Sequence, residues 1–368
     1  MANWFQSLFQ KKSKSRLGID LGSSTIKLVE VLPKEKKMKL ETYGLAYFSA
    51  EGFKSKFSEE KQFAEIYKSE VEQTSETIFR QGSSTGSIFD VLSNKEISKI
   101  VRELRVQSKA KANMAYFSLP VFATFSTIIE LPDMPREEIA AAIPFEAKKY
   151  IPIPLEDVEL DWMFVEKPAA DQDNQNSEGA LVAKNEQPEK IQIILVAILK
   201  EAIEKYLKIA KAANIGVLAL EPESFSLVRS LVNSGSGKET TLLIDIGSSF
   251  ADIILVDKGA IRLVRNDKKR LEAETGQIDK ALLASRIKES IGLYQNKGQG
   301  IKNEKVKCVL TGGSALAPEL ADFLAKELNQ EVLIGNPFSG IEYDKILEPA
   351  LKEVGPSLSV AAGLAMRE

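Results

Sequence analysis

The sequence predicts an α/β protein that contains two related halves, and two observations support this expectation. A strand, a Gly-Ser turn and a second strand occur as a unit near residue 20 and again near residue 245. Around both units, short apolar strand-like runs alternate with amphipathic helical stretches, a pattern typical of mixed α/β domains. The 368 residues are 44% hydrophobic and 27% charged, which is enough chain for about two to three globular domains.

The first half opens with strand-like runs separated by turn residues. LGIDL, TIKLVEV and KLETYGLAYF predict an antiparallel meander over residues 17–48. Residues 54–105 are expected to be mainly helical, with a Gly/Ser-rich loop at 81–87. Two further strands are predicted on either side of Pro120.

A helix is predicted from Pro135, and Pro144 within it is expected to kink or break it. The run DVELDWMFVEK indicates a strand, and the polar residues 168–190 indicate a disordered loop between strands. IQIILVAIL is continuously apolar, so it predicts a buried strand. An amphipathic helix is expected next, ending near Gly216.

The second half repeats the strand–turn–strand pattern in TTLLIDIGSSFADIILV and adds a third strand after the tight turn DKG. A charged helical stretch at 267–296 is followed by a strand, the pair Gly312–Gly313 and another helix. The chain then reaches SVAAGLA at 359–365.

The repeated turn is the most specific feature of the sequence. A shift of 225 residues aligns five identical positions, namely Ile19, Asp20, Gly22, Ser23 and Ser24 with Ile244, Asp245, Gly247, Ser248 and Ser249. Glycine lets a backbone approach an anion closely, successive turn N–H groups form an anion-binding nest, and serine hydroxyls add donors. The two turns therefore predict a clasp around one polyphosphate. The alternative is a repeated turn with a purely structural role.

Three further features fit a phosphate clasp. The aspartate at each strand end, Asp20 and Asp245, could hold Mg²⁺ through water, because Mg²⁺ prefers oxygen ligands and keeps its waters. Lys27 could approach a phosphate or face solvent. Gly312 and Gly313, at a strand end before a helix, would let an adenosine lie against the backbone.

The composition excludes several classes of function. The chain has no histidine, which rules out Ser-His and Cys-His nucleophiles and His-ligated metals. Its net charge of −3 argues against non-specific binding to nucleic acid. The single cysteine, Cys308, lies in an apolar strand-like run and is expected to be an inert core thiol in a reducing cytoplasm.

The N-terminal segment, MANWFQSLFQKKSKSR, combines apolar residues at helical spacing with a basic run. Either it is a frayed tail, or it is a short amphipathic segment at the membrane interface. In the second case its aromatic side chains enter the lipid headgroup region and its basic side chains contact anionic lipid. No run reaches the ~20 apolar residues that a membrane span needs. The predicted membrane-contacting residues are Trp4, Phe5, Leu8 and Phe9.

These motifs resemble the actin-like ATPase superfamily, and within it the chain is most similar to the PilM-like type IV pilus assembly proteins of the FtsA/PilM branch. The resemblance rests on the two DxGSS turns, on EPESF (221–225), on LTGGS with a later PEL, and on IIELPDMPREEIAAAIPFEAKKYIPIPLEDVELDW, which resembles the inserted IC subdomain of that branch. It implies an actin-like (ribonuclease H-like) fold with two duplicated domains. The implied parts are an amphipathic segment (1–15), domain IA (16–118, 191–235 and 355–368), subdomain IC (119–190) and domain II (236–354) with a shortened IIB (267–307).

The resemblance also implies roles for individual residues. ATP with Mg²⁺ would be the cofactor, and Glu221 would lie near the Mg²⁺ and the attacking water. The cofactor-binding residues would be Asp20, Gly22, Ser23, Ser24, Thr25 and Lys27 in the first motif, Asp245, Gly247, Ser248 and Ser249 in the second, and Gly312, Gly313 and Ser314 in the adenosine motif.

The implied role is a cytoplasmic scaffold at the inner face of the cytoplasmic membrane. It would bind the N-terminal cytoplasmic tail of a PilN-like inner-membrane protein in a groove between IA and IC, lined by Ile143, Phe145, Tyr150, Ile151 and Ile153. The assembly ATPase or platform protein would be further partners, with peripheral membrane contact and self-association left open and no nucleic acid involved. The alternatives are an FtsA-like division protein and a sugar-kinase-type phosphotransferase.

The sequence departs from the actin-like pattern in two places. Only about forty residues (267–307) separate the second phosphate hairpin from the adenosine motif, so one wall of the nucleotide cleft is expected to be reduced. Phe250 stands where a small or hydroxylated residue is common. The expectation is therefore nucleotide binding with at most weak ATPase activity.

Overall fold

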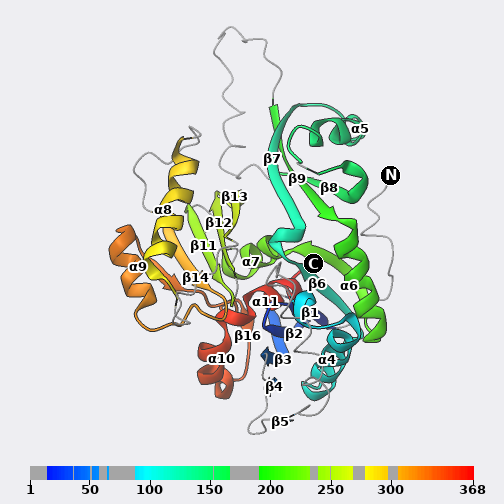
Figure 1. Ribbon diagram of the computed structural model, residues 1–368, viewed down its shortest axis with the longest axis vertical. Coiled ribbons are helices and arrows are strands. Elements are labelled where there is room, and N and C mark those ends of the chain that lie inside the picture. The colour runs from blue at the N-terminus through cyan, green and yellow to red at the C-terminus, as the bar shows by residue number, and fades with distance from the viewer. Residues whose placement is uncertain are drawn as a thin grey trace. The chain divides into compact units, whose positions relative to one another are not determined.

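The computed structural model describes residues 15–35, 37–49, 52–57, 64–65, 88–151, 153–165, 190–232, 239–248, 250–267, 278–296 and 306–368. The chain divides into two compact units: residues 1–122 with 202–368 form unit 1, and residues 123–201 form unit 2. Figure 1 gives the labels of the helices and strands.

The first sheet of unit 1 is built on the predicted meander. Within the described residues it has eight strands in the order β10-β6-β1-β2-β3-β4-β5, with β16 pairing to β3. β1, β2 and β3 are antiparallel, whereas β6 and β10 continue the sheet in parallel beyond β1. The strands are β1 (Arg16–Leu21), β2 (Thr25–Pro33), β3 (Met38–Ser49), β4 (Gly52–Phe57), β5 (Ala64–Glu65), β6 (Met114–Leu119), β10 (Gly216–Pro222) and β16 (Ile341–Glu342).

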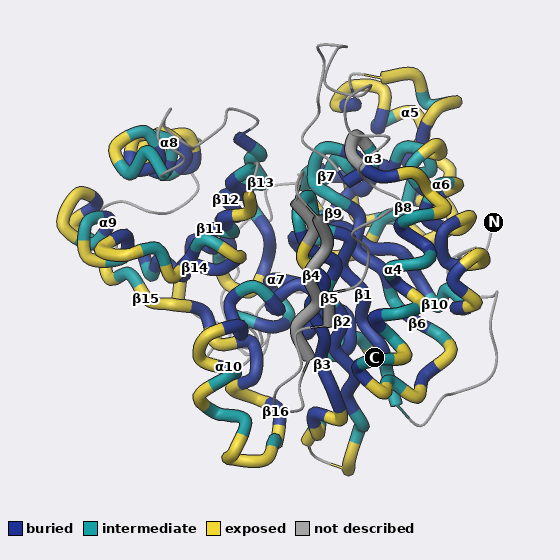
Figure 2. Tube along the Cα trace, turned by 60° about the horizontal axis from the view of Figure 1, so that its bottom comes forward, coloured by how far each residue is buried: buried dark blue, intermediate teal, exposed yellow. Residues whose placement is uncertain are grey.

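Helices cover both faces of this sheet. A Cβ at Gly44 would lie 3.0 Å from Leu104 of α4 (Asn94–Gln107). The neighbours of Gly44, Tyr43 and Leu45, belong instead to a buried cluster with α10 (Glu348–Val354) and α11 (Ser359–Ala365). Successive side chains of a strand point to opposite faces, so α4 covers one face and α10 and α11 the other. Figure 2 shows β1 and β2, between these helices, as mostly buried.

The second sheet of unit 1 has the strand order β13-β12-β11-β14-β15 in the described part of the chain. Alternate residues again face opposite layers, because Ile244 packs with α8 and α9 while Leu243 packs with α7 and α11. The elements are α7 (Glu223–Leu231), β11 (Thr241–Ile246), β12 (Ala251–Asp257), β13 (Ala260–Asp267), α8 (Lys280–Asn296), β14 (Lys307–Thr311), α9 (Leu320–Leu328) and β15 (Val332–Ile334).

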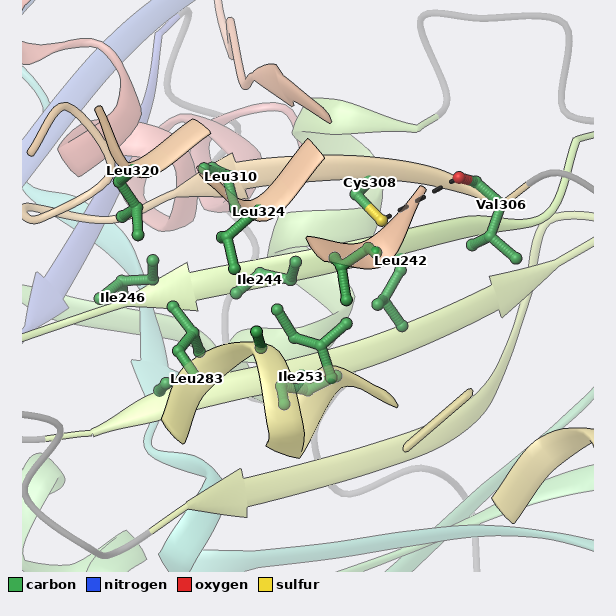
Figure 3. Close-up of a cluster of buried hydrophobic side chains, with 14 of the residues drawn as sticks. Leu242, Ile244, Ile246, Ile253, Leu283, Val306, Cys308, Leu310, Leu320 and Leu324 are labelled. Carbon is green, nitrogen blue, oxygen red and sulfur yellow. Dashed lines mark hydrogen bonds between the residues drawn. The ribbon is translucent and has the colours of Figure 1, made fainter. Parts of the chain in front are cut away.

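Cys308 lies in the core between this sheet and α8 and α9 (Figure 3). It is fully buried, and burial raises the pKa of its thiol to about 12. A thiol in this state is not a nucleophile at neutral pH, so the sequence-based prediction of an inert core cysteine is confirmed.

In its described residues, unit 2 is a three-stranded antiparallel sheet, β7-β9-β8, with α5 packed on it. Ile139, Ile143 and Ala147 of α5 join alternate β9 residues such as Leu195 in its core. The elements are β7 (Thr124–Pro132), α5 (Arg136–Ala147), β8 (Val158–Phe164) and β9 (Lys190–Leu199). α6 (Lys200–Ala212) leads from β9 back into unit 1, and α3 (Ile88–Val91) precedes α4.

Three expectations from the sequence need correction. Residues 54–57 lie in β4 rather than in a helical region. α5 continues past Pro144 to Ala147, so the predicted break is absent; only the last turn lies beyond the proline. β9 pairs with β7 and β8 and so belongs to the inserted sheet. The resemblance to PilM-like proteins instead implied that residues from 191 onward belong to domain IA. The continuous apolar run of β9 reflects burial in that smaller sheet.

Candidate functional site

The two repeated turns face each other in unit 1. Each has the same internal hydrogen bond, because the Gly22 N–H donates to the Thr25 carbonyl over 3.1 Å and the Gly247 N–H donates to the Phe250 carbonyl over 2.9 Å. The hydroxyl oxygens of Ser23 and Ser248 lie 2.9 Å apart. The tertiary fold therefore brings together two segments that are 225 residues apart in the chain.

Asp20 and Lys27 form a fixed ion pair beside the first turn. They are directly opposite each other on β1 and β2, and Lys27 Nζ lies 2.8 Å from Asp20 Oδ2. Ser118 Oγ donates to the other carboxylate oxygen over 2.8 Å. Burial lowers the pKa of Lys27, but the carboxylates of Asp20, Asp245 and Glu223 together more than offset this, so the pKa lies above its ordinary value and Lys27 stays charged.

The glycine pair after β14, Gly312 and Gly313, lies in contact with the strand end that leads into the second turn. Gly312 has φ +91°, and a Cβ there would lie 2.3 Å from Asp245 Oδ1 and 2.5 Å from the Ile246 carbonyl. The following Ser314 N–H donates to the same Ile246 carbonyl over 3.0 Å. Gly313 has open space around its Cβ position. Gly312 is thus the position at which any side chain would displace the Asp245 carboxylate.

These elements surround one cavity of about 380 Å³. Its lining combines backbone-rich turns, a cluster of carboxylates and an apolar wall in which the rings of Phe122 and Phe250 lie 6.0 Å apart. The predicted cofactor residues in the lining are Asp20, Gly22, Ser23, Ser24, Thr25, Lys27, Asp245, Gly247, Ser248, Gly312 and Gly313. Ser314 is held beside them through its hydrogen bonds to Ile246 and Gly247.

Three carboxylates of the cavity form a candidate cation site. Glu223, Asp245 and Asp252 each offer an oxygen within 4.8 Å of the others. None of the three forms an ion pair with the described residues. The Oδ1 atom of Asn266 is buried without a hydrogen-bond partner there, while its Nδ2 donates to Asp252 over 2.6 Å. Converging oxygen donors that are not themselves ion-paired, with Lys27 bound to Asp20 instead, fit a hard divalent cation such as Mg²⁺.

The electrostatics of the carboxylates agree with this fit. Burial raises the pKa of Asp245 to about 6, with Lys27 opposing the shift. Burial and the Asp245 charge raise the pKa of Asp252 to about 7. Burial, followed by Asp20, Asp252 and Asp245, raises the pKa of Glu223 well above its ordinary value. A bound divalent cation would oppose these shifts, because its positive charge stabilises the ionised carboxylates.

Sequence reasoning missed Glu223 and Asp252. Asp252 pairs directly with Asp245 across β11 and β12, so its place in the site follows from the hairpin register. The sequence did carry that signal, because a seven-residue separation across a four-residue turn puts the two aspartates opposite each other. Glu223 begins α7 after Pro222, and which glutamate of EPESF reaches the cavity depends on the geometry of the strand-to-helix turn.

Glu221, the predicted catalytic residue, has a different environment. It is buried, and its two carboxylate oxygens accept hydrogen bonds from Ser226, Arg229 and Arg367. It is absent from the described residues that line the cavity, whereas Glu223 is present. Glu221 therefore does not lie at the cation site as predicted, because its carboxylate is turned to Ser226, Arg229 and Arg367 instead of to the cavity.

The predicted partner-binding residues divide into two groups. Ile143 and Ile151 are buried in the core of unit 2, so their assignment to a binding surface is wrong. Phe145, Tyr150 and Ile153 are exposed, with fractions of 71%, 43% and 38%. Helical periodicity explains the difference, because Ile143 faces the sheet from α5 and Phe145 lies two residues, or about 200°, around the helix.

Some predicted residues lie outside the described part of the chain. These are Ser249 and the N-terminal residues Trp4, Phe5, Leu8 and Phe9. Among the described helices, none is long and apolar enough to cross a membrane.

Comparison with known proteins decides the family. The model of the family described as "Type IV pilus assembly protein PilM" matches residues 86–269 and 279–368, which is well over half of the chain. The chain belongs to this PilM family. The matched region contains β6, α7, the second turn and the glycine pair, and it lacks the first turn.

A solved structure of a PilM-PilN complex contains a protein with a fold similar to that of this chain. The chain is similar to a protein of a "PilM-PilN type IV pilus biogenesis complex", with 20% identity, a TM-score of 0.69, and coverage of 97% of this chain and 99% of that one. A Bacteroides thetaiotaomicron protein with an actin-like ATPase fold is more distant, at 12% identity and a TM-score of 0.46, with 98% of both chains covered. The prediction of a PilM-like α/β protein is confirmed.

Proposed function

We propose that this PilM-family protein is a scaffold of type IV pilus assembly that binds a nucleotide with Mg²⁺ in the cavity of unit 1. The observation that carries the proposal is the 2.9 Å approach of Ser23 and Ser248, which sets two phosphate-type turns against each other. Neither turn alone would be specific evidence. Two of them converging on one cavity, beside a cluster of carboxylates, favour a clasped polyphosphate.

Different residues of the cavity would contact the phosphates, the adenosine and the cation. The turns at Gly22–Thr25 and Gly247–Ser248 would donate backbone N–H groups and hydroxyls to the phosphates, and the segment from Gly312 to Ser314 would lie against the adenosine. The Asp20 carboxylate already accepts from Lys27 and Ser118, so it would act on the cation through water at most. Glu223, Asp245 and Asp252 are better suited to hold the cation. Bound Mg²⁺ would supply the positive charge that lets phosphates approach these carboxylates.

Hydrolysis is at most weak in this proposal. Glu221 is held by two arginines and a serine, so it is not free to accept a proton from water. Phe122 and Phe250 give the cavity an apolar wall. The family match favours a pilus scaffold over a division protein or a sugar kinase.

Asp245→Asn is expected to weaken Mg-ATP binding about 10- to 100-fold, because a charged ligand contact contributes roughly 1.5–3 kcal/mol. Isothermal calorimetry with and without Mg²⁺ would measure the effect. The matched control is Asp322→Asn on the exposed face of α9, which should bind as the parent does. If the parent protein shows no Mg²⁺-dependent affinity for ATP, the proposed nucleotide role is wrong.

We further propose that the cytoplasmic tail of a PilN-like inner-membrane protein is the partner, bound through unit 2. The similar solved structure is a complex of PilM with PilN, which supports this choice. The exposed side chains Phe145, Tyr150 and Ile153 offer apolar anchors for a peptide. The protein would thus lie at the inner face of the cytoplasmic membrane, with the N-terminal aromatic and basic segment as a second peripheral contact. The assembly ATPase, the platform protein and self-association remain further candidate contacts.

Phe145→Ser is expected to weaken binding of a PilN-type tail peptide at least tenfold, since an aromatic anchor commonly contributes more than about 1.4 kcal/mol. Fluorescence anisotropy with the labelled peptide would measure it. Ile346→Ser in unit 1 is a matched control, because Ile346 and Phe145 are both 71% exposed. Equal affinities for the two variants would contradict this assignment of the anchor.

A further inference from the structure

The two sheets of unit 1 are joined through α7 and α11. The chain leaves the first sheet at β10, passes through α7 and enters the second sheet at β11. It returns from β15 through β16 and α10 to α11, its last helix. Figure 1 shows α7 and α11 between the two sheets. Any change in the angle between the sheets must therefore involve these two helices, together with the segment that joins β15 to β16.

α11 is in close contact with both sheets and with α7. A Cβ at Gly363 of α11 would lie 1.9 Å from the Ser226 carbonyl of α7, and a Cβ at Gly18 of β1 would lie 2.2 Å from the Ala361 carbonyl of α11. Val360 and Leu364 of α11 also pack with the second sheet. The helix is therefore wedged between the sheets, with backbone-to-backbone contacts on two sides that leave little room for adjustment.

Hydrogen bonds and ion pairs around the Glu221 carboxylate link α7 to α11. This carboxylate sits at the end of β10, and Arg229 of α7 binds both of its oxygens at 2.7 and 3.1 Å. Arg229 also donates to the Gly363 carbonyl of α11 over 2.7 Å. Arg367, just after α11, donates to Glu221 over 2.7 Å and stacks 5.7 Å from the Tyr116 ring on β6. The network thus joins β6, β10, α7 and α11 around one buried carboxylate.

We infer that Glu221, Arg229 and Arg367 are positioning residues that hold the two phosphate-type turns at their close approach. The turns lie at the ends of β1 and β11, one in each sheet, so their separation depends on the angle between the sheets. Loosening the contact between α7 and α11 lets this angle vary. The turns then spend less time at 2.9 Å, and a ligand that bridges them binds more weakly. The effect on nucleotide affinity rests on the proposed function; the effect on turn proximity does not.

Arg367→Gln is the informative change. It removes one of the two side-chain links from the network to α11 and its C-terminal end, while the Arg229 bond to the Gly363 carbonyl remains. Arg229 still neutralises Glu221, so no buried charge is left unpaired and the fold should survive. The control is Arg265→Gln in β13. Arg265 resembles Arg367 in exposure, at 25% against 30% for the side chains, and also pairs with one glutamate, Glu289.

Turn proximity can be read without any nucleotide by placing thiols at Ser23 and Ser248. In the Ser23→Cys/Ser248→Cys protein, the rate of disulfide formation under a mild oxidant reports how often the turns meet. Cys308 does not compete, because it is fully buried and burial raises its pKa to about 12. A second series, with both serines intact, gives the affinity for Mg-ADP and Mg-ATP by calorimetry.

Arg367→Gln is expected to slow disulfide formation and to weaken nucleotide binding, each by about fivefold or more, with the melting temperature close to that of the parent. Arg367→Lys keeps the ion pair and should retain the parent's rate, and Arg265→Gln should match the parent in both series. An unchanged disulfide rate in folded Arg367→Gln overturns the inference.

Two further outcomes are also decisive. If Arg367→Gln does not fold, Glu221→Gln is measured in its place, with the same expected slowing and with an unchanged rate again overturning the inference. If the parent binds no nucleotide but Arg367→Gln still slows disulfide formation, the proposed nucleotide function fails while the positioning role stands.

Discussion

Replacing Gly312 by alanine is expected to abolish measurable Mg-ATP binding and to lower the free energy of unfolding by about 2–3 kcal/mol. Gly312 has φ +91°, a conformation that L-residues with a side chain rarely adopt. The new methyl group would also lie 2.3 Å from Asp245 Oδ1 and 2.5 Å from the Ile246 carbonyl. The backbones of Gly312 and Ile246 cannot move apart without a large cost in free energy. The Asp245 carboxylate would therefore be displaced from the cation site.

Calorimetry with Mg-ATP and thermal unfolding would measure the two effects of Gly312→Ala. Gly340→Ala is a matched control, since it adds the same methyl group at a glycine that does not line the cavity and has no neighbour within 4 Å. It should bind and unfold nearly as the parent does. Equal behaviour of the two variants would mean that the close approach of Gly312 to Asp245 does not matter for binding.

The affinity of the cavity for Mg²⁺ or Mn²⁺ is expected to fall by up to about 1,000-fold between pH 8 and pH 5. The pKa values of Asp245 and Asp252 are raised to about 6 and about 7, mainly by burial. Below its pKa, each group must lose a proton before it can bind a cation, which costs about tenfold in affinity per pH unit. At pH 5 this gives about tenfold for Asp245 and about 100-fold for Asp252.

The same groups predict the pH dependence of stability in the absence of a divalent cation. Their folded-state pKa values lie above the unfolded value of 3.8, so the folded state binds more protons between these limits. The resulting stabilisation is complete below about pH 4 and is lost as the pH rises through 6 to 7. Glu223 acts in the same direction. Saturating Mg²⁺ should restore stability at pH 8 by binding the folded state.

Titration with Mn²⁺ at pH 5, 6, 7 and 8, followed by calorimetry or electron paramagnetic resonance, would test this dependence. Asp252→Asn serves as the control, because it should remove the part of the pH dependence that belongs to the higher pKa. A cation affinity that is constant across this pH range would contradict the assignment of the carboxylates as ligands.

Much of the fold and of the pair of Gly-Ser turns could be predicted from the sequence, because both depend on local patterns. The strand–Gly-Ser–strand units specify hairpins through turn chemistry and alternation, and the structure has both, with matching hydrogen bonds from Gly22 and Gly247. Their duplication pointed to two halves that share one site. The sheet that contains β9 could not be predicted, because its continuous apolar run indicates a buried strand in whichever sheet it joins.

The remaining site residues depended on long-range packing. EPESF contains two glutamates, and nothing in their spacing says that Glu223 faces the cavity while Arg229 and Arg367 hold Glu221. Arg367 is 146 residues away from Glu221 in the sequence. Similarly, the apolar residues of α5 look alike in sequence, and the position of the unit 2 sheet buries Ile143 while leaving Phe145 exposed.

The sequence by itself thus determined the α/β class, the duplicated turns, the inert cysteine and the resemblance to PilM-like proteins, because these follow from residue types and short-range spacing. Only the tertiary structure decided that the two turns meet at 2.9 Å, that Asp252 and Glu223 complete a carboxylate cluster with Asp245, and that Glu221 ties α7 to α11. The physical reason is that hydrogen bonds and desolvated charges act over a few ångströms in space, whatever the distance along the chain.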